Sequence, residues 1–200
     1  MYYTVVNDNF FENPDEVVKF ANTLKYHKSD MSTDGNFWPG ERTESLNKID
    51  EELFYSIIKK VISSYYNFEY EKVKYDGANV YFHKISKDTD LTNSKHNDVG
   101  KELAAVIYLN KENSLKTGTT ICDDFSNESI KIGNQYNRMV SYDATKIHTP
   151  TGYNVSGEYR LTVTVFIENI VVIMWLRLAK VKGMLYNDYY VWWTNWKSKR

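Results

Sequence analysis

Residues 94–110, SKHNDVGKELAAVIYLN, join a polar loop to an apolar strand and hold the feature around which the rest of the chain is organised. The loop carries His96 and Asp98 with one residue between them, and the apolar run Leu103–Leu109 follows at once. A short apolar run bounded by polar residues is typical of a buried strand. Two potential metal ligands therefore stand directly before a strand of the core.

Further strands are predicted on both sides of this one. Short segments rich in Val, Thr and Tyr alternate with Gly, Asn, Ser and Asp; they are YEKVKYDGANVYFHKI, TGTTICDD, RMVSYDAT and YRLTVTVFIENI. Two helices are predicted before them. The first begins at Pro14 with Asn13 as N-cap, and the second spans Asp50–Tyr66 with apolar residues at helical spacing. Helices followed by strands predict an α+β fold, with helices packed on an antiparallel sandwich or barrel.

The composition indicates a globular protein. Of the 200 residues, 42% are hydrophobic and 16% aromatic, which excludes a disordered chain, and the formal charge of −1 gives no reason to expect general nucleic-acid binding. Cys122 is the single cysteine, so no disulfide can form within the chain and a reducing compartment is expected. The start lacks a basic n-region, and the run VVIMWL is too short to span a bilayer. We therefore expect a soluble, cytoplasmic protein.

The predicted organisation is one domain over residues 1–170, with a helical part at 1–68 and a strand-rich core at 69–170. Residues 171–200 form a basic, aromatic C-terminal extension with six Lys or Arg residues against Asp188 alone. Such a composition is typical either of a terminal element packed on the domain or of a surface that binds a partner. Both interpretations stay open.

Three residues further along complete a pattern with His96 and Asp98. His148 follows the predicted strand RMVSYDAT, and Arg160 and Thr162 lie in the strand EYRLTVTVFI. Two imidazoles and one carboxylate form the facial triad that holds non-heme Fe(II), with positions left open for other ligands. Arginine supplies a planar fork for a carboxylate. Each feature alone is common, since an isolated histidine is more often a loop or core residue, but the joint pattern is much rarer.

Together these residues resemble the Fe(II)/2-oxoglutarate-dependent oxygenases, of the prolyl-hydroxylase-like, bacterial or phage type. The pattern of that superfamily is H-x-D, a distal His, and Arg-x-Ser/Thr on the last core strand, and the resemblance covers residues 75–168. It implies a double-stranded β-helix, or jelly-roll, core with the N-terminal helices packed on it. It implies a dioxygenase that hydroxylates a C–H bond of an unidentified substrate and releases succinate and CO2.

The resemblance also implies the roles of individual residues. Fe(II) would be bound by His96, Asp98 and His148. The distal carboxylate of 2-oxoglutarate would be bound by Arg160 and Thr162. Weaker candidates for the same cosubstrate, which are equally typical of plain sheet residues, are Tyr108, Asn79 and Tyr81.

Several alternatives narrow the function. Nucleic-acid demethylases of the superfamily carry a second arginine six residues after the first, where this chain has Phe166, so a protein side chain or a small molecule is favoured as substrate. The carboxylate of Asp98 favours hydroxylation over halogenation. The competing hypothesis is a non-catalytic, cupin-like jelly-roll module that binds a ligand or another protein.

The segment Trp38–Arg42 could line a substrate entrance or be a packed loop. His83, His27 and Cys122 are expected to be structural, solvated and buried in the core, respectively.

Overall fold

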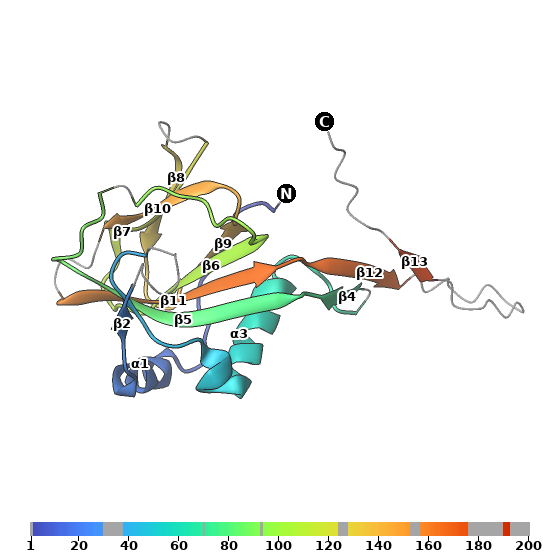
Figure 1. The fold of residues 1–200 in the computed structure, drawn as a ribbon, viewed down its shortest axis with the longest axis horizontal. Helices are drawn as coiled ribbons and strands as arrows, with labels where there is room; N and C mark the ends of the chain where they lie inside the picture. The colour runs from blue at the N-terminus through green and yellow to red at the C-terminus, as the bar shows by residue number, and fades with distance from the viewer. Residues whose placement is uncertain are drawn as a thin grey trace, which may run out of the picture.

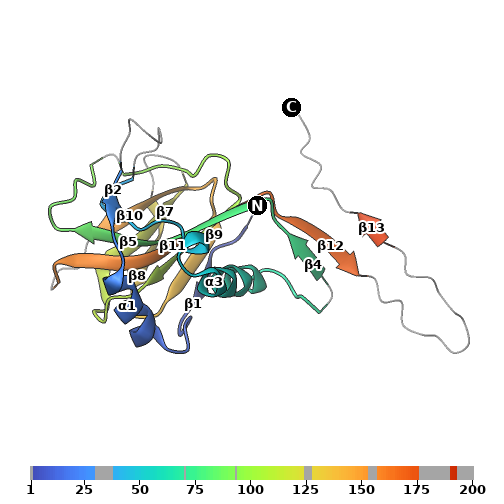
Figure 2. The ribbon, with the colours of Figure 1, turned by 60° about the horizontal axis from the view of Figure 1, so that its bottom comes forward.

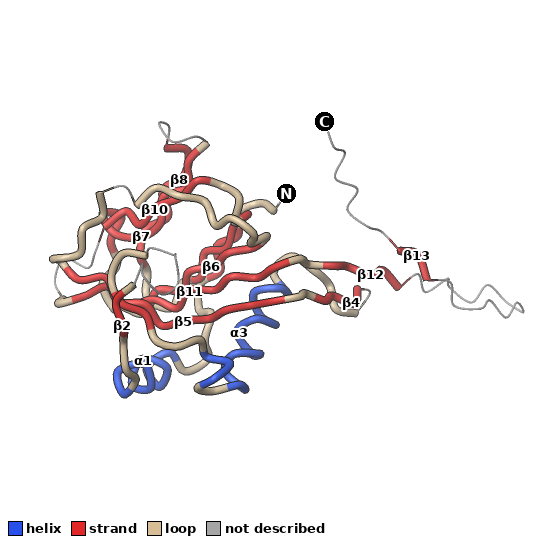
Figure 3. Tube along the Cα trace, in the orientation of Figure 1, coloured by secondary structure: helices blue, strands red, loops and turns tan. Residues whose placement is uncertain are grey.

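The computed structural model describes residues 2–29, 38–69, 71–92, 94–123, 128–152, 157–175 and 190–192. Helices α1 (Pro14–Thr23) and α3 (Glu51–Ser63) and the 3-10 turn η1 (Leu46–Lys48) precede most of the strands. Figure 3 shows the helices on one side of a body built of strands. The predicted order of helices before strands is confirmed.

The helices begin where the sequence indicates. Pro14 occupies the first turn of α1, although Asn13 makes no capping bond with its side chain. Asp50 caps α3, because its carboxylate accepts a hydrogen bond of 2.9 Å from the backbone N–H of Leu53. The helix ends at Ser63, three residues before the predicted end. Its apolar face is buried and consists of Phe54, Ile57, Ile58, Val61 and Ile62.

The main sheet has seven strands in the order β1-β9-β6-β11-β5-β3-β2. Their bounds are β1 (Val5–Asn7), β9 (Met139–Asp143), β6 (Leu103–Tyr108), β11 (Tyr159–Glu168), β5 (Gly77–Ser86), β3 (Glu41–Arg42) and β2 (His27–Lys28). All of its strand pairs are antiparallel. Both helices lie on one side of this sheet (Figure 1).

A second antiparallel sheet covers the other side of the main sheet. Its order is β10 (Ile147–Gly152), β7 (Ser114–Cys122) and β8 (Glu128–Asn134). Figure 1 shows these strands opposite the helices, with the main sheet between the two layers. This arrangement is the predicted α+β fold with a jelly-roll core.

Strand β11 separates two buried clusters, because successive side chains of a strand point to opposite faces. Leu161, Val163 and Val165 pack in the cluster on the helix side. Thr162 and Thr164 point toward the second sheet and are also buried. The side chains of RLTVTVFI are therefore buried on both faces of the strand, and β11 lies at the centre of the fold.

Strands β4 (Glu71–Lys74), β12 (Val171–Trp175) and β13 (Tyr190–Trp192) form a third sheet in the order β13-β12-β4. Figures 1 and 2 show it extending away from the body of the molecule. Residues 176–189 and 193–200, which carry the basic side chains of the predicted extension, lie outside the described residues, so the extension's role and the boundary at residue 170 stay predictions. Among the described helices, none is long and apolar enough to cross a membrane.

The segment Trp38–Arg42, for which the sequence offered a packed loop or a substrate entrance, ends in a short strand. Glu41–Arg42 form β3, which pairs with both β2 and β5. Gly40 permits this close approach, because its φ is +85° and a Cβ there would collide with the backbone carbonyl of Lys84. A strand of two residues gives no alternation in the sequence, so the pattern could not reveal it.

Candidate metal centre

The loop before β6 and strand β10 are joined at the centre of the site by backbone hydrogen bonds. The N–H of His96 donates to the carbonyl of His148 at 3.0 Å, and the N–H of His148 donates to the carbonyl of His96 at 2.8 Å. The N–H of Asp98 donates to the carbonyl of Ala144 at 2.9 Å. These bonds fix the backbone of all three predicted ligands.

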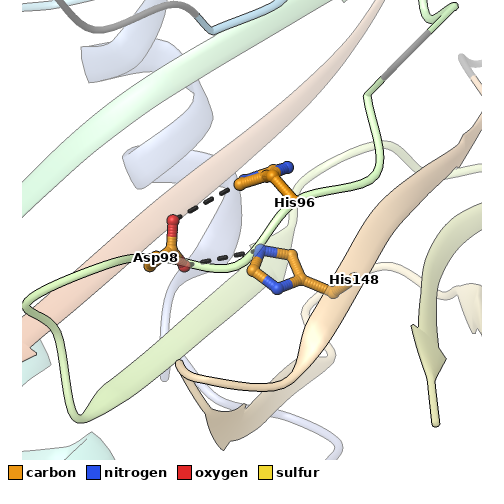
Figure 4. Close-up of side chains that lie close together, drawn as sticks. All are labelled: His96, Asp98 and His148. Carbon is orange, nitrogen blue, oxygen red and sulfur yellow. Dashed lines mark ion pairs between the residues drawn. The ribbon is translucent and has the colours of Figure 1, made fainter. Parts of the chain in front are cut away.

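The three side chains converge on one point (Figure 4). One ligand atom of each of His96, Asp98 and His148 lies within 4.8 Å of the others. Nε2 of His96 lies 3.6 Å from Oδ1 of Asp98, and Nε2 of His148 lies 3.4 Å from Oδ2. Ligand atoms about 2.1 Å from one metal are roughly 3 Å from each other, so small side-chain movements would complete the coordination.

Each histidine is oriented by a backbone carbonyl. Nδ1 of His96 lies 2.7 Å from the carbonyl oxygen of Ser94, and Nδ1 of His148 lies 2.9 Å from that of Lys146. A carbonyl oxygen only accepts, so each Nδ1 carries the proton and each Nε2 presents a lone pair toward Asp98. This is the tautomer that a metal-binding imidazole requires.

The electrostatics of the cluster also suit a cation. Burial lowers the pKa of His148 and so favours its neutral form, while the neighbouring Asp98 raises the pKa of His96. Oδ2 of Asp98 is buried, and no described residue donates a hydrogen bond to it. An unsatisfied buried carboxylate oxygen is costly, and a divalent ion would compensate it. The donor set therefore fits a divalent metal such as iron.

Arg160 lies on β11 and is 4% exposed. Its Nη1 donates to the carbonyl oxygens of Gly118 at 2.6 Å and Gly152 at 3.0 Å. Its Nε is buried without an acceptor, and no carboxylate of the described residues pairs with it. Because Nε and Nη2 share the other edge of the guanidinium, Nη1 anchors the group while the edge suited to a carboxylate stays free.

The other predicted cosubstrate residues share this face of the main sheet. In register with Thr162 on β11 lie His83 on β5 and Tyr108 on β6. Two residues further along β11, Thr164 is in register with Tyr81, which is followed by the pair of Phe166 with Asn79. The predicted residues thus form a row that runs along β11, roughly 20 Å from Arg160 to Phe166.

The residues of this row differ in what they contact. Tyr108 is fully buried, and its OH donates to Oγ1 of Thr119 at 2.8 Å. Oγ1 of Thr162 donates weakly, at 3.5 Å, to the carbonyl of His83. Tyr81 and Asn79 are partly buried at the end of the row away from Arg160.

A cavity of about 900 Å³ opens beside the metal ligands. His96, Asp98, Asn79 and Tyr81 line it, together with residues of the Trp38–Arg42 segment. Arg160, Thr162, Tyr108 and His148 are not part of this lining. The structure therefore places His96 and Asp98 on the wall of an open cavity, whereas His148 and the predicted carboxylate-binding residues Arg160 and Thr162 are buried outside its lining.

Sequence reasoning missed several contributors to the site. The ring of Tyr142 lies 4.8 Å from that of His148, and burial raises the pKa of Tyr142 well above its usual range, so the phenol is neutral. The carbonyls of Gly118 and Gly152 anchor Arg160. Backbone acceptors have no side-chain signature, and the contact with Tyr142 depends on a strand pairing that the spacing alone does not reveal.

Comparisons with known proteins identify folds similar to that of this chain. No protein-family model matches the chain, and no curated protein is significantly similar to it in sequence. Solved structures do match. An oxidoreductase of the 2OG-Fe(II) oxygenase family from Burkholderia pseudomallei is 10% identical, with a TM-score of 0.53 over 82% of this chain and 84% of that chain.

Two other solved structures match with similarly low identity and similar TM-scores. A prolyl-4-hydroxylase from Pseudomonas putida is 11% identical, with a TM-score of 0.53 over 83% of this chain and 92% of that one. HygX from Streptomyces hygroscopicus, whose structure holds nickel and 2-oxoglutarate, is 10% identical, with a TM-score of 0.55 over 82% of both chains. At these identities the likeness is one of fold, and it confirms the jelly-roll that the resemblance implied.

Proposed function

We propose that the chain is an Fe(II)- and 2-oxoglutarate-dependent dioxygenase that hydroxylates a C–H bond. One observation carries the proposal: the Nε2 atoms of His96 and His148 and the carboxylate of Asp98 converge, and both imidazoles are held in the metal-binding tautomer. Solved structures with the same fold include one that holds nickel and 2-oxoglutarate. When bound, iron with this cosubstrate supplies the oxidising power that activates a substrate C–H bond.

Different residues would bind the metal and the cosubstrate. His96, Asp98 and His148 would hold the metal from one side and leave the side toward the cavity open. Arg160 would bind the distal carboxylate of 2-oxoglutarate through the edge formed by Nε and Nη2. Thr162 would add a hydroxyl donor to the same carboxylate.

Tyr108, Tyr81 and Asn79 would complete the cosubstrate site along the same sheet face. Rotation of the Tyr108 hydroxyl away from Thr119 would provide a donor beside Arg160. Tyr81 and Asn79 lie nearer the cavity, so they would contact the end of the cosubstrate that approaches the metal.

The proposal is tested with the purified full-length chain. We expect succinate to form from 2-oxoglutarate in air only when Fe(II) is present, and we expect chelation to stop it. A substrate found by screening should gain the mass of one oxygen atom. Iron uptake without any iron-dependent succinate, with or without candidate substrates, would instead favour the non-catalytic jelly-roll module.

A further inference from the structure

A second arginine, Arg42 on β3, lines the cavity beside the metal centre. The rings of Trp38, Tyr81 and Phe166 surround its guanidinium, with their centroids 4.9, 5.6 and 5.5 Å from Cζ. Its Nε is buried without an acceptor, and the Arg42 side chain has no hydrogen bond or carboxylate ion pair with another described residue. Among the described residues, Asp98 is the one carboxylate whose charge acts on Arg42, and it is also a proposed metal ligand.

The segment that carries Arg42 is fixed to the main sheet. Nε2 of His83 donates to the carbonyl of Pro39 at 2.5 Å, and burial keeps the pKa of His83 well below its usual value, so the ring stays neutral. Gly40 packs against the backbone of Lys84, where a side chain has no room. Arg42 is in register with His83. Its position is thus set before any ligand binds, which lowers the entropic cost of binding.

The rings do not replace an acceptor. A cation over an aromatic ring is stabilised by about 0.5–2 kcal/mol, which is small beside the cost of burying an unpaired charge. Burial lowers the pKa of Arg42 to about 10, so the group is still charged at neutral pH. The aromatic contacts thus leave Nε without an acceptor, and a carboxylate in the cavity would supply one to the guanidinium.

Charge balance identifies the missing partner, given the proposed function. Asp98 and one carboxylate of 2-oxoglutarate would compensate a divalent metal, and the other carboxylate would compensate Arg160. Among the described residues that line the cavity, Arg42 would then be the buried positive charge without a carboxylate partner, because the lysines of the lining either pair with Glu or are exposed. The remaining component of the reaction is the substrate.

We propose that Arg42 binds a carboxylate of the substrate and so holds the reactive C–H bond between this anchor and the metal. The substrate is then a carboxylic acid whose apolar part packs against Trp38 and Phe166. A cavity of about 900 Å³ accommodates either a free acid or an acidic side chain of a peptide. The inference rests on the proposed function for the reaction, but the binding of a carboxylate can be measured without turnover.

The test uses the full-length chain loaded with Ni(II) and 2-oxoglutarate, which supports binding without turnover. Thermal shift measures the affinity of 3-phenylpropionate and of its neutral amide, and a second arm compares a blocked peptide containing one Glu with its Gln counterpart. Arg42→Gln is compared with Lys48→Gln. Lys48 lies on the rim of the same cavity and is 66% exposed, so this control removes the same charge from a solvated position.

We expect the wild type to bind at least one carboxylate probe about ten- to a hundredfold more tightly than its neutral partner, as for a charge-assisted bidentate contact. Arg42→Gln should abolish that preference, and Lys48→Gln should retain it. Selection of the free acid identifies a small-molecule substrate, and selection of the Glu peptide identifies a protein side chain.

Two results would overturn the proposal: no carboxylate preference in the wild type, or a preference that Arg42→Gln retains, whether or not this variant binds 2-oxoglutarate more weakly. If Arg42→Gln does not fold, Arg42→Lys keeps the charge and loses the fork. About tenfold weaker acid binding is then expected, and unchanged acid binding contradicts the proposal.

Failure of the proposed function is recognised separately, from nickel content and 2-oxoglutarate affinity of the wild type. A chain that takes up neither, yet still selects a carboxylate through Arg42, keeps the subsite and loses the dioxygenase. A chain that takes up both without any carboxylate selection keeps the dioxygenase and loses the subsite.

Discussion

The two faces of the main sheet bury different chemistry. Toward the helices, β11 presents Val163 and Val165 to the larger cluster of buried hydrophobic residues. Toward the second sheet, the same strand presents Arg160, Thr162 and Thr164, all less than one tenth exposed. Apolar burial stabilises the helix side. On the site side, the cost of burying polar groups offsets part of that stabilisation.

The polar atoms that are buried without partners follow the same division. In the described part of the chain they include Oδ2 of Asp98, Nε of Arg160, Nε of Arg42 and Oγ1 of Thr164. The others in that part of the chain are Nε1 of Trp38, which lines the cavity, and Oγ1 of Thr117 and the amide atoms of Asn134 in the second sheet. These atoms lie at the cavity, on the site face of β11 or in the second sheet, so we expect the helix side to govern stability and the site side to govern binding. Four substitutions test this division.

The largest effect is expected on the helix side. Phe82 is fully buried on β5 and contacts the ring of Phe20 from α1, with centroids 6.1 Å apart. Phe82→Ala should lower the free energy of unfolding by about 3–5 kcal/mol, through lost burial and the cavity that remains. Urea denaturation measures it, with the exposed Tyr55→Ala as control. A loss of less than about 1 kcal/mol would show that this cluster does not dominate stability.

Asp98→Ala should remove metal binding while leaving the fold intact. It takes away the only carboxylate of the cluster and a buried oxygen that lacks a donor, so the metal-free protein should be no less stable than wild type. The affinity for Fe(II) should fall at least a hundredfold, which is measured from the iron content after reconstitution. Asp98→Glu should also bind poorly, because the longer arm misplaces the carboxylate. Unchanged iron stoichiometry in Asp98→Ala would exclude Asp98 from the site.

Arg160→Lys should weaken cosubstrate binding about ten- to a hundredfold without changing iron content. Lysine keeps the charge but cannot bond to the carbonyls of Gly118 and Gly152 and offer a free bidentate edge at the same time. Succinate release is measured against 2-oxoglutarate concentration, and iron content is measured in the same samples. Together they separate an effect on cosubstrate binding from an effect on iron binding. Identical cosubstrate dependence in variant and wild type would make Arg160 a structural residue.

The sequence was informative where one element carries the signal. The alternation in RLTVTVFI is visible along one strand, and both faces of β11 are indeed buried. The resemblance to a family pattern grouped His96, Asp98 and His148, and the structure brings the three together. Both kinds of prediction depend on residue types and spacing, which a chain displays without its fold.

What the sequence could not reveal depends on pairing between distant elements. Arg42 reaches the cavity only because β3 pairs with β5, a contact of two residues on each strand. The anchoring of Arg160 needs the carbonyls of Gly118 and Gly152, which β7 and β10 bring together. Register across strands decides both, and register is set by the packing of the whole sheet.

The smallest expected effect is also the most direct test of the difference between the two faces. Thr164 is 7% exposed, and its Oγ1 is buried with no hydrogen-bond partner. Thr164→Val replaces the hydroxyl with a methyl group of nearly the same shape, so it removes an unsatisfied polar atom and adds apolar contact. Replacing an unpaired buried polar atom in this way should raise the free energy of unfolding by about 1 kcal/mol. Thr162→Val is the matched control, because Oγ1 of Thr162 does have a partner, the carbonyl of His83, and should show a smaller gain or a loss. If Thr164→Val is instead destabilised by 1 kcal/mol or more, its hydroxyl has a partner in solution, and the site side is less costly to fold than the division between the two faces requires.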